Sequence, residues 1–263
     1  MHGYFGTPSQ QRLQARVADM AGWIDSTPGA CNSGRAFGCD DLNALGWNAM
    51  NEIVARDGAL TFRLIPGDRR TQLSDWAAQN NFRVDFWDVF VAERGTVLAA
   101  SDIVLSQELP GALRLGPVPR EAEGAYIEAI HNLMISNGVA PYAGSFLAGH
   151  QQPAETAVVL DQSDAPIAVA FGHKPHNKHS AFGDYAYGGA VAVSPDHRAR
   201  GLGKRVNALI AKRVLSNLGG THFYEFVGAD NEVSRRMVES CGLSRNPQLF
   251  GAIAVDGDSK FTR

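Results

Sequence analysis

One segment in the last third of the chain constrains the fold more than any other. Residues 190–205 read Ala-Val-Ala-Val-Ser-Pro-Asp-His-Arg-Ala-Arg-Gly-Leu-Gly-Lys-Arg. The apolar start is typical of a β-strand, Pro195 cannot extend a sheet ladder, and the apolar residues after Lys204 recur at helical spacing. The segment therefore predicts a strand, a tight turn and a helix that begins near Gly201 and Gly203.

Such a turn gathers unpaired backbone N–H groups at a helix N-terminus, where the helix dipole favours negative charge. Glycines at the turn leave room for an anion to approach the backbone closely. The densest cluster of basic residues in the sequence accompanies the turn and consists of Arg198, Arg200, Lys204 and Arg205. We interpret these cations as partners for phosphate groups, and a diphosphate is the ligand that the pattern favours.

Two common nucleotide motifs do not fit this turn. A Walker loop needs Ser or Thr after its Gly-Lys pair so that a hydroxyl can reach magnesium, but Arg205 follows Lys204. A Rossmann fingerprint needs a third glycine, and Val206 stands in its place. The diphosphate of a different cofactor is therefore expected.

The segment resembles the acetyl-CoA motif of the GCN5-related N-acetyltransferases (GNAT), which is a strand ending V-x-V-x-P followed by R-x-x-G-x-G or A. The matching residues are Val191, Val193, Pro195, Arg198, Gly201 and Gly203. A second element agrees. Asn231-x-x-Ser234 opens a predicted helix that ends at Cys241-Gly242-Leu243, and this resembles the family's helix that begins N-x-x-A or S and closes on G-F or L. The resemblance covers about residues 113–255.

The resemblance implies an α/β (α+β) acyl-CoA N-acyltransferase fold, in which helices flank a mixed, twisted sheet, with an N-terminal α/β extension. The hydrophobic spacing agrees with that element order. From it we expect strands at 60–65, 82–92, 156–161, 167–173, 189–193, 221–227 and 249–255, and helices at 13–24, 42–53, 71–79, 122–134, 206–218 and 233–241. Residues 102–114 carry mixed signals.

The resemblance also implies the reaction and the cofactor contacts. The expected function is transfer of an acetyl group from acetyl-CoA to a primary amine of a small molecule or peptide, by direct attack in a ternary complex. The backbone of Val191, Ala192 and Val193 would line the pantetheine arm, and a strand N–H near Val193 would stabilise charge on the carbonyl oxygen. Asn231 and Ser234 would contact the arm from the next helix. The pyrophosphate would be cradled by Arg198, Ala199, Arg200, Gly201, Leu202, Gly203 and Lys204.

The residues expected to transfer protons depart most from the family's pattern. An amine of pKa about 10 must lose a proton, and family members often carry a Glu where Tyr187 stands here. We rank Glu225, one residue out of phase on the following strand, above Asp184 and Tyr187 as candidate catalytic residues. The family's usual thiolate-protonating Tyr aligns with Val238, which leaves water, Tyr224 or no group as the acid. A catalytically silent acyl-CoA-binding protein with a sensing or structural role is therefore the alternative.

Three histidines at 173, 176 and 179 have a spacing that suggests a metal site. Pro175 interrupts them, so the three rings cannot share one helix face. We therefore expect no metal and a polar hairpin turn, which in the family would border the acceptor site and tune substrate choice.

The first part of the chain, residues 1–112, precedes the predicted GNAT domain of residues 113–263, with the boundary near Pro110-Gly111. Its predicted elements over 41–92 repeat the order seen at 200–255, which suggests a degenerate GNAT-like copy. The phosphate loop is missing from this copy, because Asp40 stands where the second glycine belongs. An unrelated helical cap over the acceptor cleft is the alternative.

Charge and cysteine content limit the partners. With 24 Lys and Arg against 27 Asp and Glu, the formal net charge is −3, and no basic block suggests nucleic acid or a membrane surface. Three cysteines suit neither a disulfide framework nor a zinc ribbon, and residues 1–11 lack the pattern of a secretory signal. We expect a cytoplasmic protein, and exposed sheet edges favour a homodimer.

Overall fold

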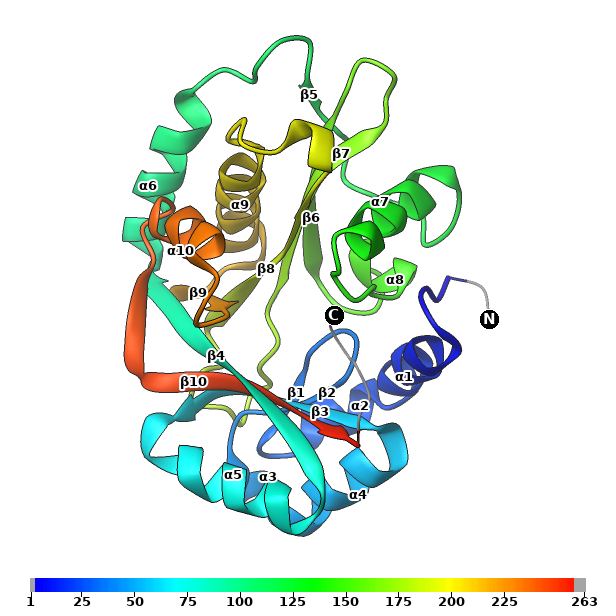
Figure 1. The fold of residues 1–263 in the computed structure, drawn as a ribbon, viewed down its shortest axis with the longest axis vertical. Coiled ribbons are helices and arrows are strands. Elements are labelled where there is room, and N and C mark those ends of the chain that lie inside the picture. The colour runs from blue at the N-terminus through cyan, green and yellow to red at the C-terminus, as the bar shows by residue number, and fades with distance from the viewer. Residues whose placement is uncertain (1–2, 258–263) are drawn as a thin grey trace.

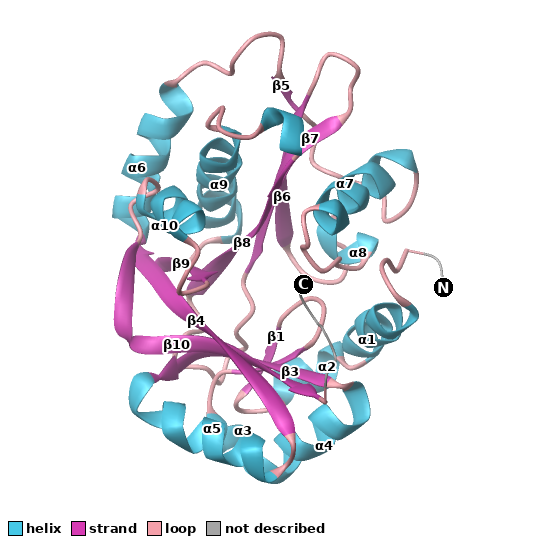
Figure 2. Cartoon of the chain, viewed as in Figure 1, coloured by secondary structure: helices cyan, strands magenta, loops and turns pink. Residues whose placement is uncertain are grey.

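The computed structural model describes residues 3–257, and their strands form one mixed ten-stranded sheet in the order β1-β2-β3-β10-β4-β9-β8-β7-β6-β5. The strands are β1 (Ala30–Asn32), β2 (Phe37–Cys39), β3 (Ala59–Pro66), β4 (Phe82–Glu93), β5 (Arg114–Leu115), β6 (Ala154–Leu160), β7 (Pro166–His173), β8 (Tyr185–Val193), β9 (His222–Val227) and β10 (Ser244–Asp256). Figures 1 and 2 show helices on both sides of this sheet. The expected fold class, a mixed sheet flanked by helices, is confirmed.

The helices are α1 (Pro8–Asp19), α2 (Ala21–Ser26), α3 (Leu42–Leu45), α4 (Trp47–Asp57), α5 (Arg70–Gln79), α6 (Arg94–Ser106), α7 (Ala125–Ser136), α8 (Gly144–Leu147), α9 (Leu202–Arg213) and α10 (Glu232–Glu239). A π-helical turn, residues 214–218, extends α9. Within the described residues, no helix combines the length and apolar character that crossing a membrane requires.

Helix α6 was not predicted from the sequence, and it overlaps the ambiguous residues 102–114 only over 102–106. It buries Val97, Ser101 and Val104 at helical spacing, and this face packs in the same apolar core as α9 and α10. Its outer face carries Ile103, which is 70% exposed and blurs the amphipathic pattern. The sequence analysis therefore missed this helix, whose buried face packs against α9 and carries few large apolar residues.

The central strands β4 and β10 cross between the two parts of the chain (Figure 1). Strand β10 lies between β3 and β4, and β4 lies between β10 and β9, with all three pairings antiparallel. The parallel pairs β2–β3 and β8–β9 flank this centre on either side. Read from either edge towards the centre, the sheet therefore has a parallel pair followed by two antiparallel strands. Strand β10, from the C-terminal part, separates β3 from β4, and β4, from the N-terminal part, separates β10 from β9. The division at residue 112 stays a prediction, and the sheet pairing extends across it.

Three apolar cores hold the helices on the sheet. The first lies under α4 and α5 and includes Met50, Phe62 and Trp76. The second packs α6, α9 and α10 against β7–β9, and the third packs α7 and α8 on the opposite face. Helix α9 is thereby fixed with its N-terminus at the end of β8, which positions the predicted phosphate loop.

Candidate active site

The site begins where two parallel strands separate. Strands β8 and β9 pair only from Tyr185 to Tyr187, after which β8 follows β7 instead. Gly188 permits the close approach of Phe223, because a Cβ there would lie 2.1 Å from that ring. The next two residues, Gly189 and Ala190, have φ values of +150° and +52°, and the β7–β8 register shifts beside them. The strand therefore bulges and leaves an open notch between β8 and β9.

A cavity of about 270 Å³ occupies this notch and continues towards the N-terminal part of the chain. Its walls come from the β8 bulge, β9, α10, the loop after α7, and the strands and loops around β3 and β10. The lining residues are Ser33, Arg35, Thr61, Arg63, Trp87, Gly138, Val139, Tyr187, Gly189, Ala190, Val191, Glu225, Phe226, Val227, Ser234, Met237, Val238, Ala252 and Ile253. Both parts of the chain therefore contribute to one cavity.

The predicted phosphate loop follows β8 at one end of the notch. Ala199 and Gly201 adopt left-handed backbone conformations with φ values of +58° and +77°, and α9 begins at Leu202. The first turn of α9 lacks preceding carbonyl partners for its amides, as at any helix start. A side chain at Gly201 would meet no atom within 4 Å, so the glycine is needed for its conformation rather than for space.

The basic residues of this loop differ in their contacts. Arg200 is exposed, and Arg198 donates to Asn137 Oδ1 at 2.7 Å. Arg205, also interpreted as a phosphate partner, instead donates to the backbone carbonyls of Gln107 and Leu105 at the end of α6. This cation binds the C-terminal carbonyls of a helix, where positive charge is favourable.

The second predicted cofactor element lies at the start of α10. Asn231 caps this helix, because its side chain accepts a hydrogen bond from the Ser234 amide at 3.0 Å. Ser234, Met237 and Val238 line the cavity. Of the two residues expected to contact the cofactor arm, Ser234 faces the notch and Asn231 holds the helix that carries it.

Glu225 is 2% exposed and points towards α9, where Asn207 Nδ2 donates to its Oε1 at 2.7 Å. Burial raises the pKa of Glu225 to about 7, and the bond from Asn207 only partly opposes this rise. A group of this pKa can exchange a proton at neutral pH, and Glu225 also contributes to the cavity lining.

Tyr187 lies at the point where the strands separate, 6% exposed and in the cavity wall. Its hydroxyl reaches the bulge, since a Cβ placed on Gly189 would lie 2.8 Å from it. Burial raises the pKa of Tyr187 to about 12, so the hydroxyl stays protonated and can donate a hydrogen bond. Asp184, the third catalytic candidate, is exposed outside the cavity lining, 3.5 Å from Lys174 Nζ.

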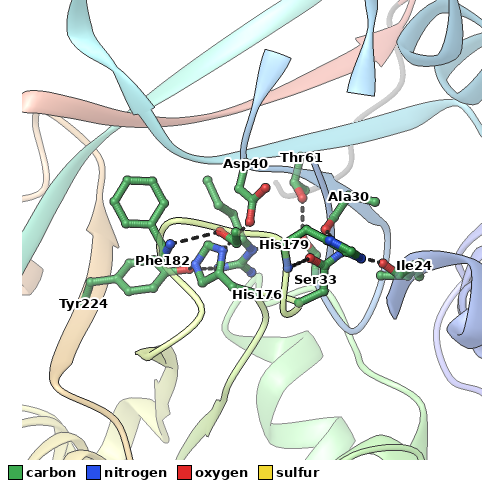
Figure 3. A network of polar contacts seen from close by, with 12 residues as sticks. Ile24, Ala30, Ser33, Asp40, Thr61, His176, His179, Phe182 and Tyr224 are labelled. Atoms are coloured by element: carbon green, nitrogen blue, oxygen red, sulfur yellow. Dashed lines mark hydrogen bonds and ion pairs between the residues drawn. The ribbon is translucent and has the colours of Figure 1, made fainter. Parts of the chain in front are cut away.

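A polar network from the N-terminal part meets β9 beside the cavity (Figure 3). Asp40 Oδ2 lies 2.7 Å from His176 Nδ1, and His176 Nε2 lies 3.0 Å from the Tyr224 hydroxyl. Arg63, from β3, donates to the same hydroxyl at 3.1 Å. The sequence did not reveal the role of Arg63, because a charged residue between the apolar Phe62 and Leu64 is the ordinary alternation of a strand with one solvated face.

The histidine loop between β7 and β8 packs against β1 and does not bring its three rings together as one ligand set. His173 contacts Gln152 Nε2 at 2.6 Å, whereas His176 joins the network with Asp40. Ligand atoms of His176, Asp40 and Cys31 all lie within 4.8 Å of one another. The predicted polar hairpin is therefore present, and its middle histidine connects the two parts of the chain.

Comparison with known proteins agrees with this geometry. Residues 127–243 match the model of the Acetyltransferase (GNAT) family. No curated protein matches the sequence.

Among solved structures, a GCN5-related N-acetyltransferase from Kribbella flavida has a TM-score of 0.57 at 13% identity, over 95% of this chain and 99% of that one. A tandem GNAT protein from the clavulanic acid biosynthesis pathway has a TM-score of 0.54 at 14% identity, over 98% and 92%. A Drosophila protein has a TM-score of 0.57 at 11% identity, over 95% and 89%. Residues 127–243 therefore match the GNAT acetyltransferase family model, and these solved structures share the fold of the chain.

Proposed function

We propose that this protein is an N-acetyltransferase that moves an acetyl group from acetyl-CoA to a primary amine by direct attack in a ternary complex. The observation that carries the proposal is the bulge at Gly189–Ala190 in the cavity wall. The same strand leads into the loop in which Gly201 makes a left-handed turn before α9. A thioester in the notch would meet strand amides, while its diphosphate would meet the start of α9.

In this proposal the exposed edge of β8 binds the extended arm of the cofactor. Val191 lines the cavity, whereas Ala192 is buried on the opposite side of the sheet, so the backbone rather than the Ala192 side chain is the available contact. Ser234 would contact the arm from α10. The residues from Arg198 to Lys204 would hold the pyrophosphate, with Arg198 fixed by Asn137.

Two groups would share the proton transfer, Tyr187 as the donor and Glu225 as the base. Tyr187, with a pKa of about 12, is suited to donate a hydrogen bond to the thioester or a proton to the leaving thiolate. Glu225, with a pKa raised to about 7, has the proton affinity of a general base, although Asn207 binds one of its oxygens. The acceptor amine would approach from the side lined by the N-terminal part.

Two observations favour the alternative of a silent acyl-CoA-binding protein. Val238 lines the notch at the position of the family's usual Tyr, and Glu225 is directed towards α9. Both features are compatible with binding in the absence of turnover.

The pairing of the central strands supports a second part of the proposal, that residues 1–112 are a degenerate copy of the GNAT fold. Strands β2, β3 and β4 with the inserted β10 follow the same pattern as β8, β9 and β10 with the inserted β4. A cap of unrelated ancestry would have no reason to reproduce that order.

The experiment that separates turnover from binding measures CoA release with a panel of amines and cofactor binding by thermal shift on the same preparation. Turnover with any amine supports the acetyltransferase proposal. Binding of acetyl-CoA with no turnover on the panel supports the silent alternative, and no binding contradicts both.

A matched pair of variants tests the phosphate loop. Gly201→Val and Gly58→Val each place a β-branched residue at a left-handed position, φ +77° and +79°, that is free of neighbouring atoms. Both should lose stability by about 1–2 kcal/mol, because the conformation disfavours a Cβ. Only Gly201→Val should weaken acetyl-CoA binding, and an unchanged affinity would refute the assignment of the loop.

A further inference from the structure

The cavity contains a buried cation that acetyl transfer by itself does not explain. Arg63 is 4% exposed, lies on β3 and lines the cavity. Within residues 3–257, its guanidinium forms no ion pair with a carboxylate. A buried charge is costly unless it is paired, so an anionic ligand in the cavity would offset that cost.

The contacts of Arg63 leave one side of the guanidinium available. Its Nε donates to Ser33 Oγ at 3.1 Å and its Nη1 donates to the Tyr224 hydroxyl at 3.1 Å. The group lies 4.2 Å from the centre of the Tyr187 ring. Nη2 has no hydrogen-bond partner among the described residues. An arginine with one satisfied side and one open side is arranged to bind a further acceptor.

The network behind Arg63 fixes its direction. Arg63 can only donate, so Tyr224 accepts from it and donates its own proton to His176 Nε2. Burial lowers the pKa of His176, whose neutral ring then donates from Nδ1 to Asp40. Tyr224, His176 and Asp40 thus act as positioning residues that hold the guanidinium against the cavity.

A second cation lies on the same side of the cavity. Arg35 is also in the lining, with Nη1 bound to the Ala140 carbonyl at 2.6 Å and its guanidinium 4.7 Å from the Tyr142 ring centre. Among the described lining residues, Glu225 is the single acidic one, and it is directed towards α9. This end of the cavity is therefore lined by two cations, and the nearby buried carboxylate, Asp40, reaches Arg63 only through His176 and Tyr224 and does not line the cavity.

We propose that the acceptor is a small amine that also carries a carboxylate, which binds Arg63 while the amine reaches the β8 bulge. This inference rests on the proposed acetyl transfer. A carboxylate fits the planar, hydrogen-bonding guanidinium, and Trp87 and Phe226, whose rings stack at 6.1 Å, supply an apolar wall for the rest of the molecule. The volume of about 270 Å³, shared with the end of the cofactor arm, suits an amino-acid-sized acceptor.

The test compares amino acids with their carboxamides and with the corresponding decarboxylated amines at pH 7–9, and expresses kcat/KM per concentration of the neutral form of each amine. We expect kcat/KM to be about 10- to 100-fold higher for the carboxylates, the range given by a hydrogen bond to a charged group. Arg63→Gln should lower kcat/KM for the carboxylates by that factor, mainly through KM, and lower it by a clearly smaller factor for the neutral amines. Arg63→Lys should retain part of it. Arg69→Gln, outside the cavity lining, is the matched control.

Equal rates for acids and amides, or an equal loss for both in Arg63→Gln, would overturn the inference. Turnover of neutral amines alone would do the same and leave acetyl transfer intact. A phosphorylated amine, phosphoethanolamine, is included, and a preference for it over every carboxylate would also contradict the proposal.

Calorimetric titration of the CoA-saturated protein with N-acetylated amino acids and their amides decides the point independently of turnover. Carboxylate-selective binding that Arg63→Gln abolishes would support the inference even if no amine is acetylated. Thermal unfolding of each variant checks that the fold is retained.

Discussion

The buried carboxylate of Glu225 predicts an unusual dependence of stability on pH. Its pKa is raised from 4.5 to about 7 by burial, so between these values the folded protein binds more protons than the unfolded chain. The free energy of unfolding should therefore fall as pH rises from about 4.5 to 7. A shift of this size, at about 1.4 kcal/mol per pKa unit, corresponds to about 3.5 kcal/mol at most.

Urea denaturation of the wild type and of Glu225→Gln at pH 5, 6, 7 and 8 measures this effect. The glutamine keeps the size of the side chain and an acceptor for Asn207 Nδ2, and it cannot ionise. We expect the variant to gain stability relative to the wild type as pH rises, by about 2–3 kcal/mol between pH 5 and pH 8. Glu155→Gln is the matched control, because Glu155 accepts a comparable bond from Asn217 at 2.8 Å on the surface.

A difference between wild type and Glu225→Gln that does not change with pH would refute the assignment of a buried, destabilised carboxylate. The same variant also tests the chemistry. Loss of kcat with retained acetyl-CoA binding would identify Glu225 as a group that handles the proton, whereas unchanged turnover would restrict it to the core beneath α9.

Two further predictions concern the insertion of β4 between β9 and β10 and the N-terminal cap of α10. Residues 113–257 expressed alone lack β4, so β9 and β10 lose the strand that pairs with both of them. We expect the exposed strand edges to cause aggregation or association of copies, and a stable monomer by light scattering would contradict this. Asn231→Ala should cost about 1 kcal/mol in thermal unfolding by removing the bond to the Ser234 amide, and an unchanged melting temperature would show that the cap contributes nothing.

The local features of the GNAT part were predictable from the sequence because short-range constraints create them. Pro195 ends the strand, Gly201 permits the left-handed turn, and apolar spacing marks α9, whatever the rest of the chain does. The strands at 60–65 and 82–92 were also correctly predicted, since their apolar character and flanking turns lie within a few residues.

The orientation of catalytic side chains depended on the register between strands. Glu225 was predicted to be out of phase with the family's usual acid, and the β8–β9 pairing places it towards Asn207 while Tyr224 faces Arg63. The role of Arg205 likewise followed from the position of α6, whose carbonyls it binds. No spacing within a single segment contains this information.

The sequence by itself determined the turn between β8 and α9 and the approximate positions of β3, β4, β6, β7, β9, β10, α5, α7, α9 and α10. Only the tertiary structure decided that β10 inserts between β3 and β4 and that β4 inserts between β10 and β9. It also decided that Arg63, Tyr224, His176 and Asp40 meet at one end of the cavity. The physical reason is the range of the interactions. Turns and helix starts depend on neighbours within a few residues, whereas a buried charge and its partners are selected by packing between segments more than a hundred residues apart.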